Sequence, residues 1–348
     1  MGLNREQFVI LASLAKAGVL ADKACLTLGR QNNFLRHSDL KAIAKAVGIE
    51  LDDGSAKEFL NARFIEPILY KFGAKSADSI DACTYEGASI AGDLNVPIPD
   101  DLRGKFEFVY DGGTLEHIYN YPQALRNVSY LLSSGGILFS TSPANNEPGH
   151  GFYQFSSELI FSAFPKNDLE ILAAFLVATQ SPAQFYALLP PPAGERITFL
   201  SGEPVQLFVI ARKVSRTLGD SSVLQSDYVA GKWKSGADHA TWDRSLKAKL
   251  KRLFHRIVVL RLIWPVNFLL RSLYFPCPAV WATSSGIRRI SIRDAAARAC
   301  ALGVEVDSPA LVPVAQIFDL TDFIRNHGRE SGAAVMPAER QVVERTEE

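Results

Sequence analysis

Cysteine is scarce in this chain, and what there is shows no pairing pattern. Only four cysteines occur in 348 residues, at positions 25, 83, 277 and 300, and none forms a CxxC pair. We therefore expect small buried apolar side chains rather than ligands at these positions. We expect no signal peptide, because charged residues interrupt the opening segment. A reducing cytoplasmic location fits this cysteine usage best.

The chain also lacks an apolar run of membrane-spanning length. The longest apolar stretch, at 257–270, is broken by Arg261, Pro265 and Asn267. It falls short of the roughly 20 apolar residues that a spanning helix needs. We therefore expect no transmembrane helix.

Net charge is absent as well, although the charges are unevenly distributed. The whole chain sums to zero, yet residues 244–293 hold 11 Lys or Arg and no Asp or Glu. Apolar residues recur at helical spacing within this segment, as at Leu246, Leu250 and Leu253. A basic amphipathic helix of this kind either lies on an anionic membrane or packs on the main domain. No nucleic-acid partner is expected, since no recognised binding motif is present.

The most informative stretch of the sequence is 106–143. Two apolar runs, at 106–109 and 137–139, enclose a helical pattern, and an aspartate and two glycines follow the first run at 111–113. This order predicts two parallel strands joined by a right-handed helical crossover. Ligands of such sheets bind beyond the carboxyl ends of the strands. We therefore expect a pocket at residues 111–117.

The segments DGGTLEHI at 111–118 and GGILFSTSP at 135–143 resemble two strand segments of the class I S-adenosylmethionine-dependent methyltransferases. The words YEGA, ANN and GHGFYQFS further resemble a group of bacterial methyltransferase-like proteins, some of them in surface-polysaccharide pathways. The resemblance covers about 24–164. It implies a Rossmann-like α/β fold, with helices on both faces of a seven-stranded sheet whose last two strands, at 169–177 and 205–213, form an antiparallel edge.

Helical patterns are expected over 6–20, 38–47 and 56–72, with Ser38 capping the second of them. Pro122 falls inside the pattern after the fourth strand. Proline suits the first turn of a helix, so we expect a helix to begin there and a separate short turn to precede it at 115–119.

Acidic or glycine residues close four expected strands in succession, at Gly29, Asp81, Asp93 and Asp111. In doubly wound folds an acidic side chain at the second of these ends accepts hydrogen bonds from ribose hydroxyls, so Asp81 is the first candidate and Glu86 its rival. The resemblance implies an adenine-edge position for the pair at 93–94. The residues assigned to the donor S-adenosylmethionine are Gly29, Arg30, Gln31, Asp81, Glu86, Asp93, Leu94, Asp111, Gly112, Gly113 and Glu116.

The loop after the first strand departs from the family pattern. It reads GRQNN at 29–33, with one glycine where the family has several, because the backbone there must approach the donor closely. Arg30 and Gln31 are either contacts for a carboxylate or phosphate, or solvated loop residues. The missing GxGxxG motif argues against a nicotinamide-dependent oxidoreductase.

The loop at 143–156 carries two of the three candidate catalytic residues, and the turn after the fourth strand carries the third. Methyl transfer to a hydroxyl needs in-line placement of the nucleophile and a base with a pKa near neutrality. His150 is the first candidate base, His117 the second, and Tyr153 the candidate for orienting the acceptor. The alternative is that His150 and Tyr153 pin the loop by hydrogen bonds. No metal site is expected.

These observations predict a methyltransferase-like domain over 1–214, a linker over 215–240, a helical basic region over 241–327 and a disordered tail over 328–348. The function expected is methyl transfer from S-adenosylmethionine to a small-molecule or glycan-linked acceptor in surface-polysaccharide biosynthesis. The alternative is a methyltransferase fold without catalysis that serves as a binding module in glycan assembly.

Overall fold

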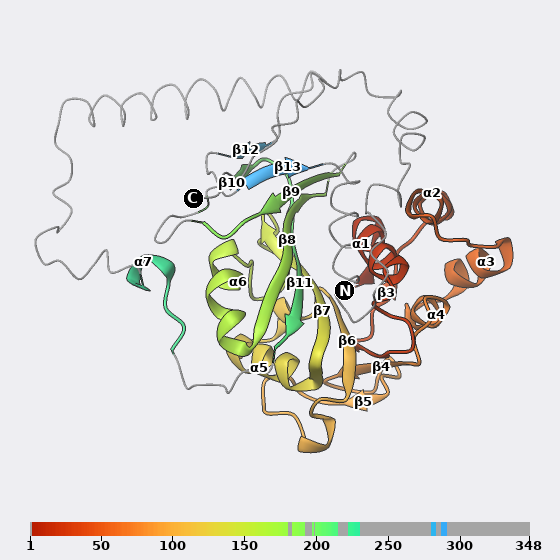
Figure 1. Cartoon of the computed structure of the whole chain (residues 1–348), viewed down its shortest axis with the longest axis horizontal. Helices are drawn as coiled ribbons and strands as arrows, with labels where there is room; N and C mark the ends of the chain where they lie inside the picture. The colour runs from red at the N-terminus through yellow and green to blue at the C-terminus, as the bar shows by residue number, and fades with distance from the viewer. Residues whose placement is uncertain are drawn as a thin grey trace, which may run out of the picture.

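A computed structural model of the chain describes residues 2–179, 183–191, 197, 199–214, 222–229, 280–282 and 287–290. These residues form a central β-sheet with helices on both of its faces (Figure 1). Most of the predicted linker, most of the predicted basic region over 241–327 and the whole tail over 328–348 lie outside the described residues, and so does most of the segment expected to meet a membrane.

Within the described residues the main sheet has nine strands. In spatial order they are β13 (Ile287–Ile290), β9 (Gln184–Leu188), β8 (Leu169–Ala178), β11 (Val205–Lys213), β7 (Leu132–Asn145), β6 (Phe106–Gly112), β2 (Ala24–Leu28), β4 (Ser76–Asp81) and β5 (Ile90–Ala91). The strands from β7 to β5 are parallel. Strand β11 is antiparallel to both of its neighbours, β7 and β8.

This strand order confirms the predicted Rossmann-like α/β sheet. The chain starts in the middle at β2, moves outward through β4 and β5, and then returns to the other side of β2 to build β6 and β7. The reversal leaves a topological switch point between β2 and β6, which is where doubly wound sheets bind ligands.

The sheet is wider than the seven strands predicted. Strand β9 pairs antiparallel with β8, and β13 pairs antiparallel with β9, so the expected last pair of strands is not the edge. A separate small pairing joins β10 (Phe199–Ser201) to β12 (Val280–Ala282). Strands β12 and β13 come from the region expected to be helical.

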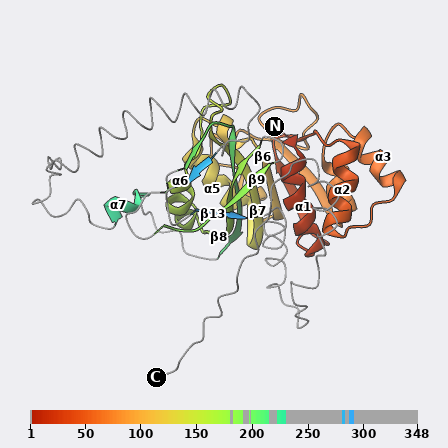
Figure 2. The same cartoon turned by 90° about the horizontal axis from the view of Figure 1, so that it is seen from above.

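Helices cover the two faces of the sheet. The helices of the described residues are α1 (Arg5–Lys16), α2 (His37–Val47), α3 (Asp53–Asn61), α4 (Glu66–Lys71), α5 (Tyr121–Leu131), α6 (Ser157–Ala163) and α7 (Ser226–Val229), with 3-10 turns η1 (Asp100–Leu102), η2 (Leu115–His117) and η3 (Pro165–Asn167). Helix α3 packs on α2 and α4, and α7 lies apart from the sheet. Figure 2 shows α5 and α6 on one side of the sheet and α1 and α2 on the other.

Alternation along the strands produces the two cores. On β6, Phe108 and Tyr110 are buried with Phe8 of α1, whereas Val109 is buried with Leu125 of α5. Side chains on a strand alternate between faces, so a sheet covered on both sides needs a nearly continuous apolar run. Such a run is also a clear sequence signal, which explains why the central strands could be predicted from the sequence.

The helix after Pro122 follows the prediction, and two other helical expectations were wrong. Helix α5 begins at Tyr121 with Pro122 in its first turn, after the separate turn η2. Residues 56–72 form two helices instead of one, because Pro67 occupies the first turn of α4 and could not continue an earlier helix. Helix α2 already starts at His37, so Ser38 is not its cap.

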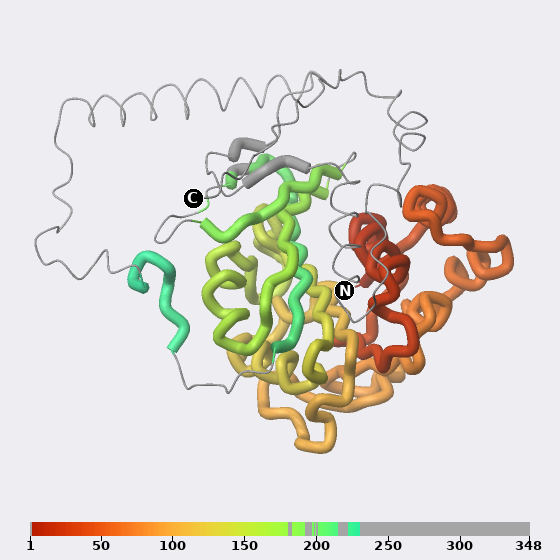
Figure 3. Tube along the Cα trace, in the orientation of Figure 1, coloured from red at the N-terminus to blue at the C-terminus, as the bar shows by residue number. Residues whose placement is uncertain are grey.

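The amino-terminal segment lies beside the ends of the central strands (Figure 3). Strand β1 (Gly2–Leu3) pairs with β3 (Asn32–Asn33), in the loop that follows β2. Gln7 of α1 donates a hydrogen bond of 2.6 Å from Nε2 to Thr141 Oγ1 of β7. The start of the chain therefore closes part of the edge at which a ligand is expected.

Cys25 is buried as predicted, whereas Cys83 is exposed in the turn after β4, where that prediction was wrong. Among the described residues, no helix combines the length and the apolar character needed to cross a membrane.

Candidate functional site

The ends of the central strands meet at one edge of the sheet, as predicted. Leu28 of β2 pairs in register with Asp111 of β6, and Asp81 of β4 pairs with Ala91 of β5. The backbone N–H of Gly29 donates to Ile80 O at 2.7 Å, which ties the end of β2 to β4. Polar groups following β2, β4 and β6 therefore share one surface across the switch point.

Arg30 is built into the loop after β2. Its backbone N–H donates to Asp81 Oδ2 at 3.3 Å, and its Nε lies 3.0 Å from Glu66 Oε1. Its Nη1 donates to the carbonyl oxygens of Glu86 and Gly87. The guanidinium is partly exposed, and the carboxylate that it contacts is that of Glu66 within the chain.

Gln31 is fully buried beneath the same loop. Its Nε2 donates to the carbonyl oxygen of Leu28 and, at 3.0 Å, to Thr114 Oγ1. Its Oε1 is buried and has no hydrogen-bond partner among the described residues. That oxygen faces Gly112, where an added Cβ would lie only 2.5 Å away. A buried acceptor without a partner is costly, so this oxygen is a natural contact for a ligand donor group.

The remaining acidic side chains at this edge differ in burial and in their hydrogen-bond or ion-pair partners. Asp81 is half-buried and uses Oδ2 for the Arg30 amide. Glu86 lies 2.6 Å from Arg63 in an ion pair. Asp93 is exposed, and hydrogen bonds from the backbone and side chain of Asn95 lower its pKa. The side chain of Leu94 is buried in the core, and its carbonyl oxygen accepts a hydrogen bond from Asn127 Nδ2 at 3.0 Å.

Asp111 is completely buried and holds the turn that follows β6. It accepts hydrogen bonds from Ser140 Oγ at 2.7 Å and from the backbone N–H of Thr114 at 2.8 Å. Burial raises its pKa to about 6, although the bonds from Ser140 and the backbone oppose the shift. Asp111 thereby positions η2, which carries the next two ionisable residues.

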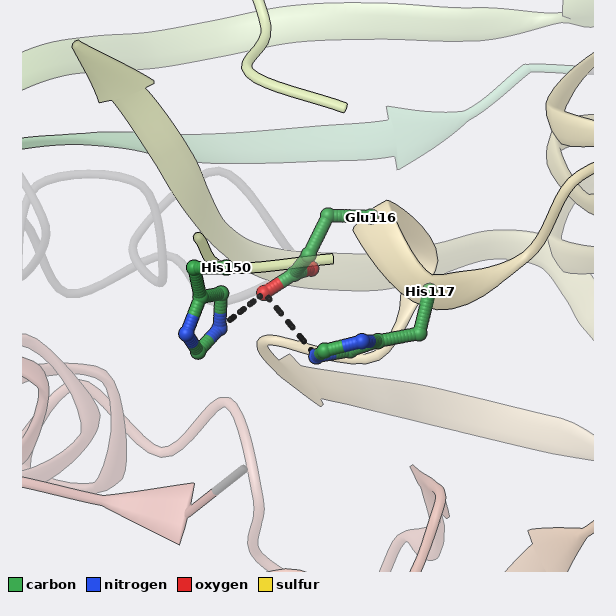
Figure 4. Close-up of side chains that lie close together, drawn as sticks. All are labelled: Glu116, His117 and His150. Carbon is green, nitrogen blue, oxygen red and sulfur yellow. Dashed lines mark hydrogen bonds and ion pairs between the residues drawn. The ribbon is translucent and has the colours of Figure 1, made fainter. Parts of the chain in front are cut away.

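Glu116, His117 and His150 form a cluster beside the strand ends (Figure 4). Glu116 Oε1 lies 3.2 Å from His150 Nε2 and 4.0 Å from His117 Nε2. The Glu116 side chain is 1% exposed, whereas those of His117 and His150 are 38% and 45% exposed. The two imidazoles thus face solvent over a buried carboxylate.

Backbone contacts bring His150 to this position. The N–H groups of Phe152 and Tyr153 donate to Glu116 O at 2.8 and 3.3 Å. Gly151 has φ of +69°, and a Cβ there would lie 2.8 Å from the same oxygen. Only glycine adopts that conformation readily and leaves room for the contact.

Burial controls the protonation of the cluster. It raises the pKa of Glu116 to about 8, and the neighbouring charge of Asp111 adds to the shift. Burial also raises the pKa of Glu147 and lowers that of His117. Acids held protonated near neutrality in a cleft are candidates for function.

A cavity of about 150 Å³ adjoins the cluster. It is lined by Gly2, Asn4, Gln7, Phe34, Gly112, Gly113, Glu116, Thr141, Ser142, Pro143, Glu147, His150 and Gln206. Buried oxygens of Glu116, Glu147 and Gln206 have no hydrogen-bond partner among the described residues. Sequence reasoning missed Glu147 and Gln206, because the pairing of β11 with β7 that brings Gln206 there leaves no local signal.

Neither Tyr153 nor His117 lines the cavity. The Tyr153 hydroxyl donates to Tyr119 O at 2.6 Å, which matches the alternative that this side chain pins the loop. His117 belongs to the cluster but does not line the cavity. Of the three candidate catalytic residues, His150 alone both belongs to the cluster and lines the cavity.

The fold and its edge define an α/β protein with a polar site at the switch point of a doubly wound sheet. No protein-family model and no curated protein matches the chain. Similar solved structures include the 1,6-didemethyltoxoflavin-N1-methyltransferase of Burkholderia thailandensis with S-adenosylhomocysteine bound. It is 11% identical, covers 59% of this chain and 79% of its own, and has a TM-score of 0.31.

Two further structures are S-adenosylmethionine-dependent methyltransferases. The one from Mesorhizobium loti is 12% identical, covers 60% of this chain and 98% of its own, and has a TM-score of 0.33. The one from Aquifex aeolicus is 11% identical, with coverages of 59% and 89% and a TM-score of 0.32.

Proposed function

We propose that the chain transfers a methyl group from S-adenosylmethionine to a small-molecule or glycan-linked acceptor, in a pathway of surface-polysaccharide synthesis. The observation that carries the proposal is the switch point between β2 and β6, with the unpartnered Gln31 oxygen on one side and Gly112 and Gly113 on the other. When bound, S-adenosylmethionine supplies an electrophilic methyl group on a sulfonium centre.

The residues at the edge fit the chemical groups of this donor. Asp81 offers a carboxylate for two vicinal ribose hydroxyls, and Gln31 Oε1 offers an acceptor for an ammonium group. Gly112 is packed against that oxygen, since an added Cβ would lie 2.5 Å from it, so the loop must move to expose the oxygen to a ligand. The cavity of about 150 Å³ is lined by neither Asp81 nor Gln31 and is smaller than the roughly 300–1,000 Å³ usual for organic ligands, so side chains or the segment at 2–4 must shift for the donor to bind beside it.

The acceptor is proposed to enter the cavity beside Glu116 and His150. A hydroxyl or amine there must lose a proton as its lone pair bonds to the methyl carbon, while the carbon–sulfur bond breaks and its electrons pass to sulfur. Glu116 Oε1, 3.2 Å from His150 Nε2, orients the ring, which leaves the other ring nitrogen, Nδ1, to take that proton.

A binding module without catalysis is the second candidate. It is favoured by the side chains of Arg30 and Gln31, which fill the loop that binds the donor in the resembling family. Such a module would keep the fold and the glycan partner and would not bind the donor.

Calorimetric titration with S-adenosylmethionine separates the two candidates. Methyl transfer requires saturable binding at one site per chain, with weaker binding in Asp81→Asn and unchanged binding in Glu86→Gln. No detectable heat at donor concentrations on the order of 1 mM, which corresponds to about 4 kcal/mol of binding free energy, would favour the module.

A further inference from the structure

We propose that Glu116, His117 and His150 bind a divalent transition-metal ion at the edge of the cavity. The site goes beyond the proposed methyl transfer, because it was not expected from the sequence and does not depend on the donor. The three residues offer one carboxylate and two imidazoles, and their ligand atoms all lie within 4.8 Å of one another.

The distances suit a metal of this kind. An ion such as Zn²⁺ holds nitrogen and oxygen ligands at about 2.0–2.2 Å, so neighbouring ligand atoms of a tetrahedral site lie about 3.4 Å apart. The carboxylate oxygen lies 3.2 and 4.0 Å from the two imidazole nitrogens. Both imidazoles are partly exposed, so a small rotation of each ring completes the site without disturbing the core.

The buried carboxylate lacks what a cation would supply. Glu116 is 1% exposed, its Oε2 has no hydrogen-bond partner, and no lysine or arginine pairs with it in the described part of the chain. Glu147 lines the same cavity, and its Oε2 is also buried and without a partner. Two carboxylates in such a place are unfavourable unless a proton or a cation compensates them.

The backbone fixes the ligands before any ion arrives. Gly113, at φ +100°, leaves space for the Glu116 carboxylate, since an added Cβ would lie 2.9 Å from Oε1. The carbonyl oxygen of Glu116 accepts the Phe152 N–H at 2.8 Å, which holds His150 over the carboxylate. Preformed ligands reduce the entropic cost of binding.

The ligand set selects the class of ion. Imidazole nitrogens suit Fe²⁺, Ni²⁺, Cu²⁺ and Zn²⁺, whereas Mg²⁺, Ca²⁺ and Mn²⁺ prefer oxygen ligands. Three protein ligands leave coordination positions open, which is typical of catalytic rather than structural sites. Two of the three ligands, Glu116 and His150, line the cavity.

The role of the ion rests on the proposed function. A metal at this point lowers the pKa of a coordinated acceptor hydroxyl. It would therefore promote loss of the acceptor proton, the role proposed above for His150. With the ion bound, His150 Nε2 is a ligand, so proton release from the acceptor no longer needs this imidazole as a base.

Cobalt titration of the untagged, metal-stripped full chain tests the site without donor or acceptor. Co²⁺ on mixed imidazole and carboxylate ligands gives visible absorption bands, and Zn²⁺ should abolish them by competition. We expect one ion per chain, and at least about tenfold weaker binding in Glu116→Gln, His117→Ala and His150→Ala. His37→Ala, which removes an exposed histidine of α2, is the matched control and should bind as the parent does.

The outcomes separate the site from the enzyme. Absence of binding of Co²⁺, Zn²⁺ and Mn²⁺, or equal binding in the parent and in the His117→Ala/His150→Ala variant, overturns the metal site. Because no donor is present, failure of methyl transfer leaves a positive cobalt result intact. Circular dichroism of each variant shows whether the fold is kept, and the double variant changes only partly exposed side chains.

Discussion

The Nε2 atom of His150 lies 3.2 Å from Oε1 of Glu116, across 34 positions of sequence. The contact joins the loop after β7 to the turn after β6, and thus the ends of two neighbouring strands beside the switch point. It is held by the backbone as well as by the side chains, since the Glu116 carbonyl accepts the N–H of Phe152. The geometry of the cluster therefore depends on the glycine between His150 and Phe152.

Replacing that glycine should loosen the cluster. Gly151→Ala places a Cβ 2.8 Å from Glu116 O at a positive φ, so we expect the free energy of unfolding to fall by about 1–3 kcal/mol. Gly104→Ala has a similar φ with open space around it, and Gly149→Ala has neither constraint. Thermal unfolding should rank the losses in that order. A Gly151→Ala loss no larger than that of Gly104→Ala would contradict the proposed packing.

Donor affinity should depend on Asp81 and not on Glu86. Asp81→Asn keeps the shape and removes the charge that accepts two hydroxyls, so affinity for S-adenosylhomocysteine should fall about tenfold, or roughly 1.4 kcal/mol. Glu86→Gln breaks only the ion pair with Arg63 and should leave the affinity for S-adenosylhomocysteine unchanged. Equilibrium dialysis gives both constants. Equal losses of affinity in the two variants would contradict the assignment of Asp81 to the ribose hydroxyls.

Leu94 should matter for stability and not for the ligand. Its side chain is buried with Val109 and Leu125, so Leu94→Ala should cost about 2–4 kcal/mol of unfolding free energy. Donor affinity measured well below the melting temperature should stay at the parent value. A lower affinity in a fully folded variant would mean that the side chain contacts the adenine.

The protonation of Asp111 should make stability depend on pH. Its folded pKa is raised to about 6 from the ordinary 3.8, so the folded state binds the extra proton in that interval. Stability contributed by this proton is present below about pH 4 and is lost as the pH rises to about 6, by roughly 3 kcal/mol for a shift of this size.

Asp111→Asn should remove that part of the pH dependence. The amide can still accept from the Thr114 N–H and donate to Ser140 Oγ, so the turn is kept. Urea unfolding at pH 4 and pH 7, in the presence of a chelator, should show that the free energy of unfolding of the variant increases relative to that of the parent as the pH rises. A difference between the two proteins that is constant with pH would contradict the buried assignment.

The sequence predicted the parts of the fold that depend on local pattern. The limits of β11 were predicted at 205–213 and observed as Val205–Lys213, because its apolar run is bounded by a proline and a polar segment. The acids and glycine at the ends of β2, β4 and β6 were also placed at one edge, since parallel strands share the direction of their ends.

What the sequence could not predict depends on contacts between distant residues. Gln206 reaches the cavity only through the antiparallel pairing of β11 with β7. The cluster joins Glu116 to His150 through a loop whose composition indicated irregular structure and no particular path. The pairing of β13 with β9 likewise joins residues about one hundred positions apart.

The most direct test of the account is a crystal structure grown with saturating S-adenosylhomocysteine. We expect density for the nucleoside across the ends of β2, β4 and β6, with the ribose hydroxyls at Asp81 and the amino group at the Gln31 oxygen. An empty edge at saturation, or a nucleoside bound elsewhere on the chain, would contradict it.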